Sequence, residues 1–214
     1  MLTLTKRIVI AGISTVLMFS IYTFIALTGM EAGVSLDLLT ELDTMIPFIP
    51  EMVWVYVSYI PLLLYGLLKA EEKPLFYGIT SAMVVSVVIA SGMFLAFPAI
   101  YPRPDILFQT DNITMLAMWL VYYFDNPINC FPSLHVALSW VIALFYKRHK
   151  KPTRFVLMFW ALAISVSVLF VKQHFLLDVG FGYVVASFSY WFVTRFYSVV
   201  GVRVEEKAKK ILKK

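Results

Sequence analysis

Long apolar segments separated by short polar turns make up most of this chain. Six of them are apolar enough to cross a bilayer, for which a helix needs about 17–25 residues. The predicted spans are Ile8–Leu27, Pro50–Leu68, Leu75–Phe97, Pro132–Tyr146, Phe155–Val171 and Phe175–Phe196. The fourth reaches this length only if Phe131 and the stems of Lys147 and Arg148 extend it. The pattern predicts an all-α membrane bundle that forms one domain over residues 1–214.

A shorter apolar segment, Ile113–Phe124, lies between the third and fourth spans and is too short to cross. Its Trp119, Tyr122 and Tyr123 are typical of a helix at the level of the lipid headgroups. The sequence therefore predicts six transmembrane helices and one interfacial extracytoplasmic helix. The first span follows Lys6 and Arg7 and has no clear cleavage site, so we interpret it as a retained signal anchor.

The composition indicates that the bilayer is the solvent. Hydrophobic residues make up 61% of the chain and charged residues 14%, whereas soluble domains have roughly 45–50% and 25%. A net charge of +5 could indicate nucleic acid in a soluble protein. Here the basic residues lie in short loops between spans, so membrane orientation explains them and no nucleic-acid partner is expected. The single cysteine, Cys130, excludes an internal disulfide.

The orientation follows from the positions of the cations. Sixteen of the eighteen Lys and Arg residues fall on the side of the N-terminus, and only Arg103 and Lys172 fall on the other. The first loop on that other side is acidic, with Glu31 and Asp37 among its residues. Cytoplasmic loops carry the excess of cations, so both termini are expected to be cytoplasmic. The basic tail Lys207–Lys214 is expected to contact anionic lipid.

Three short polar stretches open on the predicted extracytoplasmic side. They contain two of the three histidines of the chain, His135 and His174. The third, His149, lies in a basic cytoplasmic loop and is assigned no chemistry. The stretches are Tyr101-Pro102-Arg103-Pro104-Asp105, Phe131-Pro132-Ser133-Leu134-His135 and Lys172-Gln173-His174-Phe175-Leu176-Leu177-Asp178. The topology alone predicts that all three lie at about the same depth.

The third stretch has the residues of an activated nucleophile. His174 and Asp178 are four residues apart and share one face of a helix. A carboxylate there can accept a hydrogen bond from one imidazole nitrogen and leave the other free to attack. Lys172 lies beside the helix start, which makes an anion site.

The second stretch starts a helix in the same way, with Pro132 in the first turn and the Ser133 hydroxyl beside it. A protonated His135 could give its proton to a leaving oxygen, a step worth about 10²–10⁴-fold. Arg103 offers a planar fork that fits phosphate oxygens. Together these groups predict a phosphoryl-transfer site.

The three stretches resemble the motifs of the type 2 phosphatidic acid phosphatase (PAP2) superfamily, which are Lys-x6-Arg-Pro, Pro-Ser-Gly-His and Ser-Arg-x5-His-x3-Asp. Phe-Pro-Ser-Leu-His with Lys-Gln-His-x3-Asp is similar to the branch that includes inositol phosphorylceramide synthases. The resemblance implies that His174 is the nucleophile and forms a phosphohistidine, that Asp178 orients it and that His135 is the general acid. It also implies that Arg103, Ser133 and Lys172 hold the phosphate oxygens, without a metal or another cofactor.

The chain departs from the family pattern at two cations. Ala96 stands where the lysine of the first motif would fall, and Val168 stands where the arginine of the third would fall. The similarity to the branch with Lys-Gln-His implies that Lys172 replaces that arginine. A zinc site made of His135, His174 and Asp178 is an alternative, against which the nearby cations Arg103 and Lys172 argue.

The leading prediction is a metal-independent lipid phosphate or diphosphate phosphatase of the cell membrane, with an extracytoplasmic site and a lipid phosphate as substrate. One alternative is a lipid phosphotransferase, in which a lipid or polyol hydroxyl resolves the intermediate. Another is a transporter that binds an anion or a lipid without covalent chemistry. Structural roles also stay open, with His174 and Asp178 as a buried pair, Arg103 as a headgroup anchor and Ser133 as a helix cap.

Overall fold

The computed structural model describes residues 1–29, 36–106, 112–125, 127–148 and 151–211, without the side chains of residues 26–29, 148, 151 and 197–211. The elements in these ranges are helices. They are α1 (Leu4–Gly29), α2 (Glu41–Met45), the 3-10 turn η1 (Pro50–Met52), α3 (Val53–Val57), α4 (Tyr59–Lys69), α5 (Lys73–Ala96), α6 (Ile113–Phe124), α7 (Leu134–Phe145), the 3-10 turn η2 (Tyr146–Arg148), α8 (Lys151–Phe170) and α9 (Leu176–Ile211).

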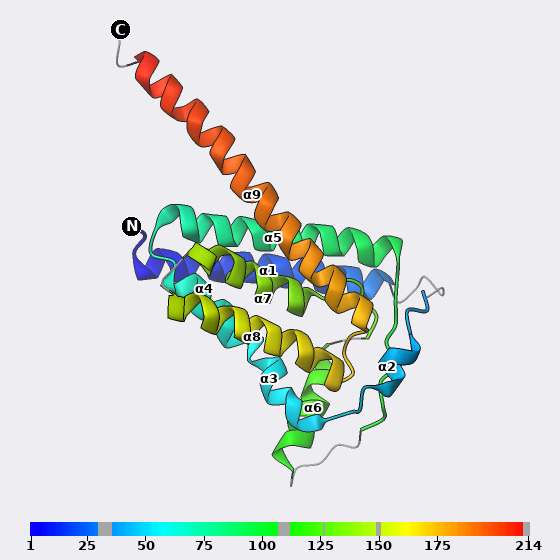
Figure 1. The fold of residues 1–214 in the computed structure, drawn as a ribbon. Helices are drawn as coiled ribbons and strands as arrows, with labels where there is room; N and C mark the ends of the chain where they lie inside the picture. The colour runs from blue at the N-terminus through cyan, green and yellow to red at the C-terminus, as the bar shows by residue number, and fades with distance from the viewer. Residues whose placement is uncertain (30–35, 107–111, 126, 149–150, 212–214) are drawn as a thin grey trace.

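The short helix α7 lies at the centre of the bundle. It packs against α4, α5, α8 and α9, and α1 packs against α5 on the outside (Figure 1). Six of its residues, including Val136, Val141 and Ile142, are buried. Because four helices surround α7, the residues at its N-terminus are held in a fixed position.

Five helices of the described ranges are long and apolar enough to cross a membrane. They are Leu4–Ile25, Pro50–Lys69, Lys73–Ala96, Pro152–Phe170 and Leu176–Phe196. The chain therefore has the helices of a multi-pass membrane protein. At 1.5 Å per residue α7 is about 18 Å long, which is less than the roughly 30 Å of the hydrocarbon core. The sixth span stays a prediction, as does the interfacial position of α6.

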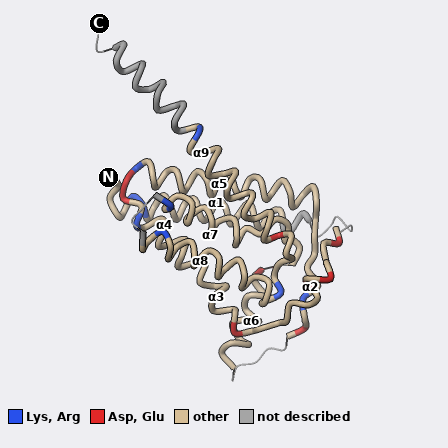
Figure 2. Tube along the Cα trace, viewed as in Figure 1, with Lys and Arg blue, Asp and Glu red and all other residues tan. Residues whose placement is uncertain are grey.

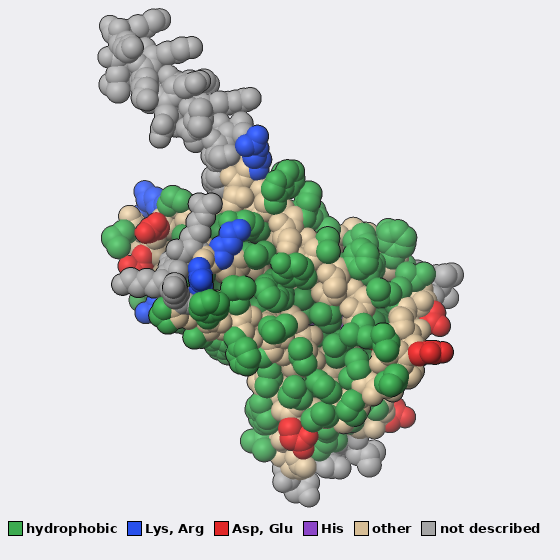
Figure 3. Space-filling view, in the orientation of Figure 1, with side chains coloured by type: hydrophobic (Ala, Val, Ile, Leu, Met, Phe, Trp, Pro, Cys, Tyr) green, Lys and Arg blue, Asp and Glu red, His purple; other side chains and the backbone are tan. Residues whose placement is uncertain are grey.

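Large apolar side chains cover the outside of the bundle (Figure 3). Val16 is 67% exposed, Phe159 73% and Trp191 57%. Side chains of this kind are stable on the outside of a helix when lipid surrounds it.

The charges are separated along the bundle. Figure 2 shows Lys and Arg mainly near the N-terminus, and Asp and Glu mainly near α2 and α6 at the other end. This separation agrees with the pattern that predicts the orientation, which itself stays a prediction. Glu31, His149 and the side chains of the tail Lys207–Lys214 lie outside the described residues.

Two isolated bridges join the loops at the end opposite the N-terminus. Ala99 pairs with Leu36 on one side and with Asn129 on the other. Next to them, the N–H of Tyr101 donates to the carbonyl of Pro127 at 3.1 Å. These bonds place the first motif stretch beside the loop that leads into α7.

Candidate active site

The start of α7 is bonded to the first turn of α9. Ser133 is the N-cap of α7, where its Oγ accepts from the N–H of Val136 at 3.4 Å. Its own N–H donates to the carbonyl of Asp178 at 3.1 Å. This contact brings the second and third motif stretches together.

The turn between α8 and α9 is a Schellman cap. The N–H of Gln173 donates to the carbonyl of Val168 at 3.0 Å, and the N–H of Lys172 donates to that of Leu169 at 3.2 Å. Lys172 has a φ of 55°, in the left-handed region where such a cap favours glycine. The cap ends α8 sharply and turns the chain so that Gln173 and His174 enter the bundle.

Two carboxylates fix the beginning of α9. Oδ2 of Asp178 accepts from the N–H of Phe175 at 2.9 Å, and Oδ1 of Asp43 accepts from the N–H of Leu176 at 2.7 Å. His174 precedes this turn, with Nδ1 3.1 Å from Oδ2 of Asp178 and 3.0 Å from the carbonyl oxygen of Cys130. The predicted pairing of His174 with Asp178 is therefore present, and it leaves Nε2 directed away from the carboxylate.

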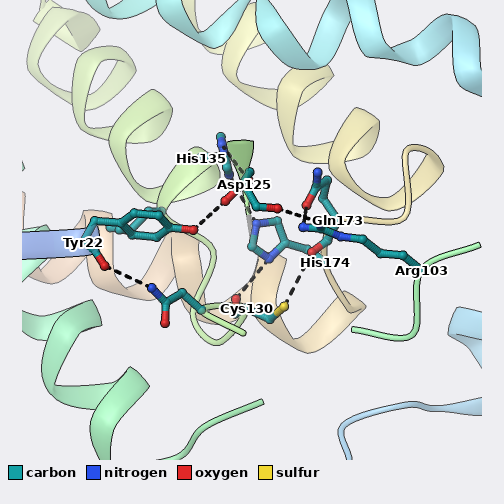
Figure 4. Close-up of a pocket in the computed structure, with 9 residues that line it drawn as sticks. Tyr22, Arg103, Asp125, Cys130, His135, Gln173 and His174 are labelled. Carbon is teal, nitrogen blue, oxygen red and sulfur yellow. Dashed lines mark hydrogen bonds and ion pairs between the residues drawn. The ribbon is translucent and has the colours of Figure 1, made fainter. Parts of the chain in front are cut away.

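The two histidines face each other (Figure 4). Nδ1 of His135 lies 3.3 Å from Nε2 of His174. The rings of Tyr56 and Tyr59 pack on His135, with centroid distances of 4.7 and 4.6 Å. His135 is therefore fixed by aromatic contacts, and His174 by hydrogen bonds.

Arg103 approaches the histidines from the first motif stretch. Its Nη1 donates to the carbonyl of Asp125, and its Nη2 donates to Oε1 of Gln173. The guanidinium lies over the ring of Tyr122, 4.8 Å from the centroid. These contacts hold the plane of the guanidinium in one orientation.

Arg103, His135 and His174 line a common pocket, as their positions on the predicted topology require. The lining residues are Tyr22, Arg103, Asp125, Asn129, Cys130, Leu134, His135, Gln173 and His174. Its volume is about 10 Å³, room for roughly one water. A phosphoryl group would have to separate the two imidazole rings in order to enter.

Two predicted phosphate ligands do not line this pocket. The Ser133 side chain is fully buried as the N-cap of α7. Nζ of Lys172 donates to the carbonyls of Asp43 and Ile46. Burial lowers the pKa of the Lys172 ammonium, and the charge of Asp43 partly opposes this effect. In this structure Lys172 fastens the end of α2 to the turn before α9.

Lys172 lines a second cavity, of about 330 Å³. The other lining residues are Leu39, Asp43, Thr44, Phe48, Tyr101, Pro102, Arg103 and Pro104. Arg103 belongs to both cavities, so the second one lies directly beside the pocket of the histidines.

Four polar residues of the pocket are not among the site residues predicted from the sequence. They are Tyr22, Asp125, Asn129 and Gln173. Asp125 directly follows the aromatic segment that ends at Phe124, Gln173 lies inside a motif stretch, and Tyr22 lies within the first span.

The surroundings of Asp125 lower the pKa of its carboxyl. Burial raises this pKa, but the charge of His135, the hydrogen bond from Tyr22 and the charge of Arg103 together outweigh the effect of burial. Asp125 is therefore ionised at neutral pH.

The third motif of the family pattern contains an arginine. In this pocket the hydrogen-bond donor from the third motif stretch is the amide of Gln173. It is 1% exposed, and its Nε2 has no hydrogen-bond partner among the described residues. Val168, at the position of the missing arginine, is buried in an apolar cluster with Tyr56 and Val136. Ala96 is exposed at the end of α5. Gln173, and not Lys172, reaches the pocket from the turn before α9.

One group of described residues has the spacing of a metal site. Ligand atoms of Cys130, His174 and Asp178 lie within 4.8 Å of one another. Burial raises the pKa of the Cys130 thiol, and a protonated thiol is a poor ligand. Nδ1 of His174 is already bonded to Asp178. These donors fit a histidine held for attack better than they fit a metal ion.

Comparisons with known proteins place these residues in a family. A family model described as the PAP2 superfamily matches residues 26–192, well over half of the chain. The Methanocaldococcus jannaschii protein named "Uncharacterized protein MJ0662" is 28% identical over 102 residues, which are 46% of this chain and 41% of that protein. The match thus spans less than half of the relative's length.

The chain is also similar to the crystal structure of Aquifex aeolicus LpxE, with a TM-score of 0.49 and 20% identity. This match covers 72% of this chain and 86% of the LpxE chain. The family match contains the three motif stretches and every residue of the pocket except Tyr22. The chain belongs to the PAP2 superfamily.

Proposed function

We propose that this chain is a metal-independent phosphatase of lipid phosphates or diphosphates that acts through a phosphohistidine at His174. One observation carries the proposal. His174 is bonded through Nδ1 to Asp178 at 3.1 Å, while its Nε2 faces a pocket that also contains His135 and Arg103. This is the arrangement of a nucleophile oriented by a carboxylate.

The reaction has two steps. Nε2 of His174 attacks phosphorus, the bond from phosphorus to the leaving oxygen breaks, and His135 gives that oxygen a proton. Water then attacks phosphorus of the phosphohistidine while His135 takes a proton from that water. The bond from phosphorus to Nε2 of His174 breaks, phosphate leaves, and His135 is protonated again. Arg103 and the free amide N–H of Gln173 would hold the equatorial oxygens. Ser133 would contribute through the helix start that it caps.

The proposed site is extracytoplasmic. Helices α7 and α9 begin at the end of the bundle opposite the N-terminus, which is also the end with few cations (Figures 1 and 2). The lining residues His135 and His174 lie at these helix starts. A lipid phosphate in the outer leaflet would reach it from the headgroup layer.

The test is phosphate release by the purified chain in detergent. The substrates are phosphatidate, phosphatidylglycerol phosphate and an isoprenyl diphosphate, each with EDTA and with added Mg²⁺. We expect at least one substrate to be hydrolysed in EDTA, with a loss of about 10⁴-fold or more in His174→Ala and no loss in His149→Ala. Activity only with added metal would refute the proposed mechanism.

A lipid phosphotransferase is the second candidate, and the cavity of about 330 Å³ beside Arg103 favours it. A transferase needs room for an acceptor headgroup, and Asp43, Thr44 and Lys172 give that cavity polar walls. Offering labelled diacylglycerol phosphate together with inositol or glycerol separates the two activities. Both activities release diacylglycerol. A phosphatase also yields free phosphate, whereas a transferase moves the phosphoryl group to the polyol hydroxyl and yields inositol phosphate or glycerol phosphate.

A further inference from the structure

Asp125 is joined to His135 through a tyrosine. Its Oδ2 accepts from the hydroxyl of Tyr56 at 3.0 Å, and that oxygen lies 2.8 Å from Nε2 of His135. Nε2 is also 3.9 Å from the carboxylate itself. The other carboxylate oxygen accepts from the hydroxyl of Tyr22. Four separate segments of the chain thus build one network around His135.

The partners on these atoms determine where the protons are. Tyr56 has a single O–H, which it donates to Asp125, so its oxygen accepts a hydrogen bond from the N–H at Nε2 of His135. On His174, Nδ1 faces the carbonyl of Cys130 and the carboxylate of Asp178, and both are acceptors. Nδ1 of His174 therefore also carries a proton.

The contact between the rings has room for one further proton. Nδ1 of His135 and Nε2 of His174 are 3.3 Å apart, and two bare lone pairs at that distance would repel each other. A proton in the contact gives the pair three protons and one positive charge. The carboxylates of Asp125 and Asp178 face this charge from opposite sides.

Resting on the function proposed above, we infer that Asp125 is a positioning residue that favours the protonated form of His135 through Tyr56, so that His135 can act as the general acid. When a phosphoryl group separates the rings, Nε2 of His174 is left bare for attack and Nδ1 of His135 keeps the proton. That proton goes to the leaving oxygen as the bond from phosphorus breaks. Water returns it in the second step, and Asp125 stays ionised throughout.

The groups that face His135 come from each element packed on it. Tyr56 and Tyr59 belong to α3 and α4, Asp125 follows α6, and His174 precedes α9. The guanidinium of Arg103 also lines the pocket. Among them Asp125 and Tyr56 are the pair that hydrogen bonds connect to Nε2 of His135, the nitrogen turned away from His174.

The experiment compares two leaving groups in the purified full chain. p-Nitrophenyl phosphate loses a phenolate that needs little protonation, whereas dioctanoyl phosphatidate loses an alkoxide that needs a proton. In Asp125→Asn and in Tyr56→Phe we expect the ratio of the phosphatidate rate to the p-nitrophenyl phosphate rate to fall about 10²-fold, the lower end of what general acid catalysis contributes.

Tyr59→Phe is the matched control, because it removes a hydroxyl from the other ring on His135, and that hydroxyl has no hydrogen bond to a described residue. Its ratio should equal that of the parent chain. Tyr56→Phe keeps the ring packing and decides the question if Asp125→Asn does not fold. An equal loss on both substrates, or no loss, would overturn the inference and leave the proposed function standing. A parent chain without His174-dependent turnover of either substrate would overturn both.

Discussion

Gly182 of α9 lies directly against the carbonyl of Ser133, the residue that caps α7. A Cβ atom added at Gly182 would be 2.7 Å from that oxygen and 3.0 Å from Cβ of Val136. The hydrogen bond from Ser133 to Asp178 crosses the same contact. The distance between His135 and His174 therefore depends on the absence of a side chain at position 182.

Gly182→Ala should push the start of α7 away from α9. Overpacking of this kind costs about 1–3 kcal/mol of stability, and a displacement of about 1 Å at a reacting group can cost 10²-fold in rate. We expect phosphate release to fall by about 10-fold or more. Gly180→Ala is the control, because nothing lies within 4 Å of a Cβ atom there, and it should match or exceed the parent in stability. Equal activity of the two variants would argue against a tight contact.

Arg103 binds both the carbonyl of Asp125 and the amide of Gln173 through one planar group. Lysine keeps the charge but cannot make both bonds or lie flat on Tyr122. Arg103→Lys should lower kcat/KM for phosphate release about 10²-fold. Arg154→Lys, at the other end of the bundle, controls for the added lysine. A loss below 3-fold in Arg103→Lys would show that a point charge is enough.

Lys172 combines a left-handed backbone with bonds to the end of α2. Both Lys172→Met and Lys172→Gly lose the hydrogen bonds from Nζ to α2. Methionine keeps the strained left-handed backbone, whereas glycine removes its conformational cost of about 1–2 kcal/mol. We expect both variants to melt below the parent in detergent, with Lys172→Gly the more stable of the two. Their KM values should stay within about 3-fold of the parent. A rise of 10-fold or more in both would instead place the ammonium on the substrate, as the motif comparison implied.

The sequence predicted most of the fold because apolar segments of spanning length are unambiguous. Its weakest prediction concerned Pro132–Tyr146, since α7 has only 12 residues and is stabilised by four neighbouring helices instead of by its own length. The sequence also predicted the convergence of Arg103, His135 and His174, because alternating spans bring their loops to one end.

The rest of the site depends on tertiary contacts that no local pattern reveals. Asp125 directly follows an aromatic segment that carries no motif, and its contacts with Tyr22 and Tyr56 come from other helices. Lys172 was assigned to phosphate because it is a cation beside a helix start. The Schellman turn directs its side chain toward α2 and directs its neighbour Gln173 into the pocket.

The phosphoenzyme tests the central claim most directly. The purified chain is mixed with a ³²P-labelled lipid phosphate that it hydrolyses, quenched within one turnover and separated by electrophoresis under alkaline conditions. We predict a labelled protein band that acid removes and alkali does not, present in the parent and in His135→Ala, and absent in His174→Ala. A band that persists in His174→Ala, or turnover in the parent without any labelled band under these conditions, would contradict the account.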